Sequence, residues 1–173
     1  LLSKAQLDAL FKWLKESPER HKFVACGIPL CPDTQGLVGE PDDKWKPAAA
    51  QRTELLNYIF DNKIRNVVFL GGDVHVSYVG QITSADDPDF CAHIVVSSAF
   101  NWVAPGLQKS SFAWGPIHNG TAPGRYRCDP LLGTSGKIIR RNNYVQIDTT
   151  GDHVMVTIKL GINGSIIEQL KLP

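Results

Sequence analysis

Apolar residues recur at helical spacing in two segments near the start of the chain. The pattern in residues 3–15 predicts a helix with one buried face, which begins after the N-cap Ser3 and ends before Pro18. The pattern in residues 47–62 predicts a second helix with Pro47 in its first turn. The residues expected to face the core are Leu7, Leu10, Phe11 and Leu14 in the first helix and Leu55, Leu56, Ile59 and Phe60 in the second.

Short apolar runs predict strands around the second helix. Residues 22–26 and 66–70 are apolar runs rich in β-branched and aromatic side chains, which is typical of buried strands. Residues 76–83 and 93–97 predict two further strands, each bounded by polar or glycine-rich segments.

The last part of the chain alternates apolar and polar side chains in residues 144–148, 153–160 and 165–172. Turn sequences, Gly151-Asp152 and Asn163-Gly164, separate these runs, so they predict a three-stranded antiparallel meander. Together with the helix and strand order before it, this predicts an α/β fold whose α/β layer continues into a larger, partly antiparallel sheet.

Two long segments, residues 27–46 and 100–140, lack a regular pattern. The second segment is rich in Gly, Pro, Ser and aromatic residues, among them Trp102, Trp114 and Tyr126. Long segments of this kind are often functional, but they also occur as packed loops, and the sequence leaves both interpretations open.

Composition narrows the class of protein. With 173 residues, the chain has the length of one domain, residues 1–173. Its net charge is +1, and residues 137–141 hold only three basic side chains, so no nucleic-acid surface is evident. No apolar run is long enough to predict a transmembrane segment.

The four cysteines, Cys26, Cys31, Cys91 and Cys128, are too few and too scattered for a disulfide scaffold. A single disulfide among them is compatible with the sequence. Cys26 ends a predicted strand and is better interpreted as a small core residue than as a metal ligand.

The strongest candidate for chemistry is Gly71-Gly72-Asp73-Val74-His75, directly after a predicted buried strand. Ligands collect at the carboxyl ends of strands in open α/β sheets, and Asp and His together suit iron, zinc or manganese. The sequence therefore predicts that Asp73 and His75 bind metal. The alternative is that Asp73 stabilises a turn and His75 is a packed histidine.

Other polar residues have simpler interpretations. Arg52 lies in the first turns of the second predicted helix, where it could reach a phosphate, but a salt bridge to a loop carboxylate is favoured. Ser97-Ser98 follows an apolar strand and could line the site, although no nucleophile elbow surrounds it. Trp45 is interpreted as a packing anchor for the long loop, and the remaining histidines as packed or solvated side chains.

A set of short sequences occurs in an order that resembles the carboxyl-terminal half of PhoD-like alkaline phosphatases, a branch of the calcineurin-like metallophosphatases. They are Leu2-Ser3-Lys4-Ala5-Gln6-Leu7 with Trp13-Leu14, residues 22–29, Asp43-Lys44-Trp45, Gln51-Arg52 with Leu55-Leu56, residues 66–75 and Val95-Val96-Ser97-Ser98. The resemblance covers the first hundred residues or so, and the tail only as a general β pattern.

The resemblance implies a partial four-layer α/β/β/α sandwich followed by the antiparallel meander. It also implies a binuclear metal site, of iron with calcium or of zinc and manganese, that hydrolyses phosphate mono- or diesters by attack of metal-activated hydroxide. Asp73 would bind the second, more oxygen-rich metal and His75 the first.

The family's bridging aspartate, its phosphate-contacting asparagine and its other ligands belong to an amino-terminal half that this sequence does not show. We therefore expect the chain to be a fragment that binds metal weakly and has negligible activity alone. A binding or regulatory domain with a phosphatase-like shell, working through the aromatic residues 100–126, is the alternative. Cellular location stays open, because family relatives are often exported and the sequence carries no leader.

Overall fold

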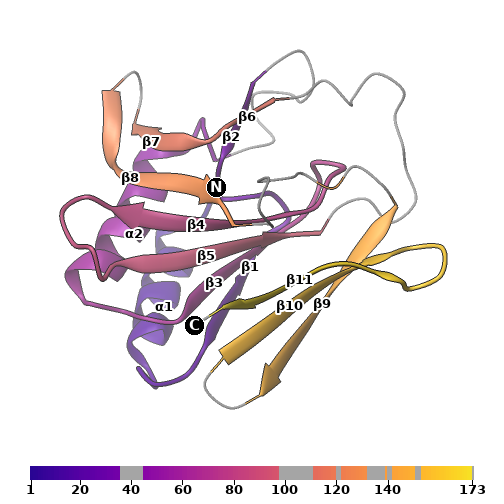
Figure 1. Ribbon diagram of the computed structural model, residues 1–173. Coiled ribbons are helices and arrows are strands. Elements are labelled where there is room, and N and C mark those ends of the chain that lie inside the picture. Colours follow the sequence, from indigo (N-terminus) through magenta and orange to yellow (C-terminus); the bar gives the residue numbers. More distant parts are fainter. Residues whose placement is uncertain are drawn as a thin grey trace.

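The structure, a computed structural model (Figure 1), describes residues 1–35, 45–97, 111–119, 122–131, 139, 142–150 and 153–172. The elements run in the order α1 (Lys4–Lys15), β1 (Lys22–Ala25), β2 (Asp33–Gln35), α2 (Ala49–Asp61), β3 (Val67–Gly71), β4 (Tyr78–Ser84), β5 (Cys91–Val96), β6 (Ser111–Ala113), β7 (Gly115–Asn119), β8 (Ala122–Pro130), β9 (Asn143–Thr150), β10 (His153–Leu160) and β11 (Ile166–Leu172).

Both predicted helices are present. Ser3 caps α1 in a capping box with Gln6, and Leu7 and Leu14 are buried on its inner face. Helix α2 begins at Ala49, slightly later than the sequence pattern predicts, and it has no side-chain cap. Within the described ranges, neither helix is long and apolar enough to cross a membrane.

A six-stranded mixed sheet forms the centre of the fold, in the order β1-β3-β5-β4-β8-β7. Strands β1, β3 and β5 are parallel, while β4, β8 and β7 continue the sheet by antiparallel pairing. The β7–β8 hairpin comes from the segment that lacks a regular pattern in the sequence. Its position shows that this part of residues 100–140 is ordered sheet, whereas residues 100–110, 120–121, 132–138 and 140 lie outside the described residues.

The predicted meander is confirmed as a separate sheet in the order β11-β10-β9. Its central strand places Val154, Val156 and Ile158 in the core. Figure 1 shows the helices on one side of the six-stranded sheet and the meander on the other. The described residues thus form a mixed α/β fold in three layers: the two helices, the six-stranded sheet and the three-stranded meander.

A buried ion pair ties α2 to the loops at one end of this sheet. Arg52 is 1% exposed, and its Nη1 lies 2.8 Å from Oδ1 of Asp33, at the start of β2. The same guanidinium donates to the carbonyls of Leu30 (3.2 Å) and His118 (3.1 Å). The predicted salt bridge between Arg52 and a loop carboxylate is therefore present. Arg52 connects helix α2, the segment from Leu30 to Asp33, and strand β7.

His93 is a buried histidine in the middle of the sheet. It lies on β5, is 5% exposed, and its Nε2 is 3.5 Å from Sγ of Cys91. Burial, together with the nearby His21, lowers the pKa of His93 to about 4. His93 is therefore neutral in the folded protein at neutral pH, and it is not placed for acid–base chemistry.

We expect His93 to make the fold sensitive to acid. Between about pH 6.5 and pH 4 the unfolded chain binds a proton at His93 that the folded chain does not bind. The contribution of His93 to the free energy of unfolding therefore falls as pH falls, by about 1.4 kcal/mol per pH unit. Denaturant titrations across this window should show a shallower slope for His93→Gln. His118→Gln, at an exposed site, is the control, and equal slopes for all three proteins would contradict the assignment.

Candidate metal site

The carboxyl ends of β1, β3 and β5 meet at one edge of the sheet because the three strands are parallel. Hydrogen bonding continues past the strand ends. The amide of Cys26 donates to the carbonyl of Leu70 (2.9 Å), and the amide of Ser97 donates to the carbonyl of Gly71 (3.1 Å). The loop after β3, which carries Asp73 and His75, therefore starts between the other two loops.

Close packing requires the first of the two glycines, Gly71 at the end of β3. A Cβ at Gly71 would lie 2.9 Å from Cα and 3.2 Å from N of Pro29, both of them backbone atoms. A Cβ at Gly72 would lie 3.4 Å from the carbonyl oxygen of Gly27 and 3.7 Å from that of Ser97. The distances at Gly72 are ordinary van der Waals contacts, whereas the absence of a side chain at Gly71 lets the loop after β1 approach the end of β3 closely.

Asp73 and His75 both have left-handed backbone conformations, with φ of 67° and 54°. Between them, the amide of Val74 donates to the carbonyl of Gly72 (2.9 Å) and closes a tight turn. Non-glycine residues rarely adopt positive φ, and such strain clusters at functional sites. Asp73 is exposed and His75 half-buried, so both side chains are at least partly accessible to solvent.

The other end of this loop is held by the second sheet. Ser77 exchanges two backbone hydrogen bonds with Ile139 (2.9 and 2.8 Å), and its buried hydroxyl bonds to the side chain of Asn143 at the start of β9. Ser97 Oγ accepts a hydrogen bond from the amide of Val145 (3.2 Å). Ser97 therefore joins β5 to the meander, and Ser98 lies outside the described residues.

The donors at this edge fit only part of a metal site. Asp73 supplies a carboxylate oxygen and His75 an imidazole nitrogen, but among the described residues no group of three or more His, Cys, Asp or Glu side chains could hold a metal ion. His93 pairs in register with Val68, well before the carboxyl end of β5, and His118 and His153 lie on β7 and β10. Protein sites usually need three or four ligands, so a metal ion held here would need ligands beyond those that the described residues bring together.

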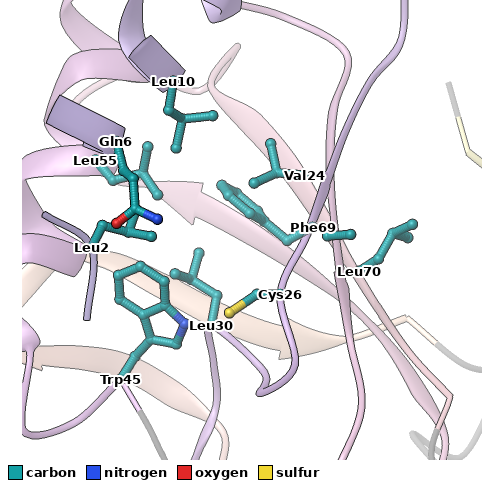
Figure 2. Close-up of a pocket in the computed structure, with 11 residues that line it drawn as sticks. Leu2, Gln6, Leu10, Val24, Cys26, Leu30, Trp45, Leu55, Phe69 and Leu70 are labelled. Carbon is teal, nitrogen blue, oxygen red and sulfur yellow. The ribbon is translucent and has the colours of Figure 1, made fainter. Parts of the chain in front are cut away.

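An apolar cavity of about 220 Å³ lies on the helix side of the same edge (Figure 2), which the sequence did not predict. Cys26 and Leu70, the residues just before the loops with Gly27 and Gly71, form part of its wall. Trp45 also lines it; the indole is 4% exposed, as expected for a packing anchor, and its Nε1 has no hydrogen-bond partner among the residues that the structure describes. The lining residues are Leu2, Gln6, Leu10, Val24, Ala25, Cys26, Leu30, Trp45, Leu55, Phe69 and Leu70.

Comparison with known proteins shows the family to which the chain belongs. The family model of PhoD-like phosphatases matches residues 1–157, and the chain belongs to that family. A solved structure titled "Structure of PhoD" superposes with a TM-score of 0.62 at 17% sequence identity. The match covers 100% of this chain and 35% of that one, so the chain spans about a third of its structural relative. No curated protein matches.

We expect Gly71→Ala to destabilise the protein by about 1–3 kcal/mol, because the new methyl group would collide with the backbone of Pro29. Gly27→Ala is the matched control, since a Cβ there meets nothing within 4 Å, and its effect should stay within about 0.5 kcal/mol. Urea denaturation measures both. Similar effects of the two substitutions would show that the loops are not closely packed.

We expect Asp73→Gly to stabilise the fold by about 0.5–1 kcal/mol, because glycine adopts a φ of 67° without strain. Asp73→Ala keeps the unfavourable backbone and should give no such gain. Thermal or urea denaturation of the metal-free protein distinguishes the two. A loss of stability in Asp73→Gly would mean that the Asp73 side chain itself supports the loop.

Proposed function

We propose that the chain is the carboxyl-terminal part of a PhoD-like phosphoesterase, that residues 1–173 form a single domain within it, and that Asp73 and His75 are two of its metal ligands. The observation that carries the proposal is the strained turn Asp73-Val74-His75 at the edge where parallel strands end. Five described non-glycine residues have positive φ, and Asp73 and His75 are the two among them that lie at the carboxyl end of a parallel strand and carry metal-ligating side chains.

The family resemblance implies that the two donors divide between two metals. The carboxylate of Asp73 suits the more oxygen-rich metal and the imidazole of His75 the other; iron with calcium, or zinc and manganese, are the candidate pairs. When bound, the metals supply activation of the attacking water and stabilisation of the charge on the phosphoryl group. The contribution of this chain is to hold both donors rigidly, because the loop is fixed at Gly71 and again at Ser77.

A preceding half of the protein would supply the other ligands, among them a bridging aspartate and a phosphate-contacting asparagine. Two observations support this. The chain corresponds to about a third of PhoD, with 35% of that chain covered. Strand β1 is the edge strand of the described sheet, so one side of it offers backbone groups with which a strand of the preceding half could pair. With that half in place, the fold would be the four-layer α/β/β/α sandwich of metallophosphatases.

The alternative, a non-catalytic binding domain that uses the aromatic segment, receives no support from the aromatic side chains the structure describes there. Tyr126 is 2% exposed and packs against Phe60 and Phe90. Trp114 lies edge-on to Tyr78, with ring centroids 5.4 Å apart. These rings belong to the core and do not form a binding surface.

Metal content and hydrolysis test the proposal. The longest natural form of the protein should bind two metal ions and hydrolyse 4-nitrophenyl phosphate or bis(4-nitrophenyl) phosphate, and Asp73→Ala or His75→Ala should lower both metal affinity and kcat about a hundredfold or more. This chain alone should bind metal weakly and have negligible activity, because it holds only part of the ligand set.

Asp148→Ala and His153→Ala serve as controls, because they remove the same side-chain types from the β9–β10 hairpin. They should leave metal content and kcat unchanged. The proposal fails if the longest form binds no metal, if Asp73→Ala and His75→Ala change only stability, or if the isolated chain hydrolyses the esters at ordinary enzymatic rates.

A further inference from the structure

The apolar cavity of about 220 Å³ is lined by parts of both helices and of strands β1 and β3 (Figure 2). Its most buried residues include Leu30, Leu55 and Phe69, which are between 1% and 4% exposed. Two other lining residues are exposed, Gln6 on α1 and Ala25 on the edge strand β1. The mouth of the cavity therefore lies between the first helix and the edge of the sheet.

Trp45 brings an unpaired hydrogen-bond donor to this cavity. The residue is 4% exposed, and its indole Nε1 has no partner in the part of the chain that the structure describes. Figure 2 shows this nitrogen on the side of the ring that faces Leu30 and Cys26, within the lined space. Native proteins rarely leave a buried N–H group without an acceptor, because its lost hydration is not replaced. The donor therefore indicates that an acceptor belongs in the cavity.

Water alone is a poor occupant of this space. A buried water molecule usually makes about three hydrogen bonds to the protein. The polar side chains of the lining belong to Trp45, Cys26 and Gln6. The side-chain oxygen of Gln6 already accepts from the amide of Ser3 (2.9 Å), and a thiol forms only weak hydrogen bonds. The other lining side chains are apolar, which favours an occupant that is itself mainly apolar.

The volume and the absence of charge limit the occupant further. A cavity of about 150 Å³ binds benzene, and in proportion 220 Å³ holds a molecule of about nine non-hydrogen atoms. None of the described lining residues carries a charge. A charged ligand would therefore lose its hydration without compensation.

We propose that this cavity is a binding site for a small, uncharged and mainly apolar molecule with one hydrogen-bond acceptor, which takes the indole N–H of Trp45. A carbonyl or ether oxygen is a suitable acceptor. The apolar part of the molecule would lie against Leu55 and Phe69. This inference does not depend on the phosphoesterase activity, because Asp73 and His75 do not line the cavity.

Such a ligand would also lie against the ends of two strands. Cys26 and Leu70 both line the cavity, and the amide of Cys26 donates to the carbonyl of Leu70 (2.9 Å) directly before the loops that begin with Gly27 and Gly71. An occupied cavity would therefore support these strand ends from the helix side.

Protection of Cys26 from alkylation tests where the ligand binds. The longest natural form of the protein is treated with iodoacetamide at increasing concentrations of acetophenone, which has this size and a single carbonyl acceptor. Peptide mass spectrometry follows the reaction at Cys26 and at Cys91, a second half-buried free cysteine that lies on β5 and does not line the cavity. With nine-tenths of the sites occupied, Cys26 should react about tenfold more slowly, and Cys91 at an unchanged rate.

A matched pair of ligands tests the role of Trp45. α-Methylstyrene has the shape of acetophenone, with a CH₂ group in place of the carbonyl oxygen, so it cannot accept a hydrogen bond. Trp45→Phe should weaken the binding of acetophenone about tenfold relative to that of α-methylstyrene, with both dissociation constants measured by ligand-observed NMR. Trp13→Phe, at an exposed ring outside the lining, is the control and should change neither constant.

The proposal is overturned if acetophenone does not bind, if it slows Cys26 and Cys91 equally, or if Trp45→Phe affects both ligands alike. Binding to this chain but not to the longest natural form would also overturn it, because another part of the protein would then fill the cavity.

Discussion

The parallel pairing of β3 with β1 on one side and β5 on the other is the constraint on which the site depends. It brings three strand ends to one edge. Backbone hydrogen bonds from the amide of Cys26 to the carbonyl of Leu70, and from the amide of Ser97 to the carbonyl of Gly71, extend the pairing into the loops. The loop with Asp73 and His75 therefore has little freedom where it begins. Packing of both helices on this sheet fixes the strands in turn.

Rigidity at this edge is combined with local strain. Gly71 lets backbone pass close to backbone, which no larger residue would permit, whereas Asp73 and His75 keep their side chains at positive φ. The fold can carry this strain because Ser77 and Asn143 anchor the far end of the loop to the meander. In a phosphoesterase, such an arrangement would hold metal donors in place before any ligand binds, at the expense of stability.

Local patterns in the sequence were sufficient to predict the helices, β3 and the meander. Helical spacing and strict alternation indicate one buried face, and a short apolar run indicates a strand buried on both faces. The place of the β7–β8 hairpin in the main sheet could not be predicted, since its pairing with β4 joins distant segments. The Asp73 and His75 pair was identified from residue type and position. Its positive φ values and the cavity beside Trp45 depend on packing between elements and leave no local signal.

The sheet order also bears on how the protein folds. The helices and the β9-β10-β11 meander need only contacts between neighbours in sequence, so each can form early. By contrast, β1 must find β3 across α2, and β8 must find β4 across β5 and the segments after it. Closing such long loops is entropically unfavourable and slows folding. The edge that carries the candidate site should therefore be among the last parts of the molecule to take shape.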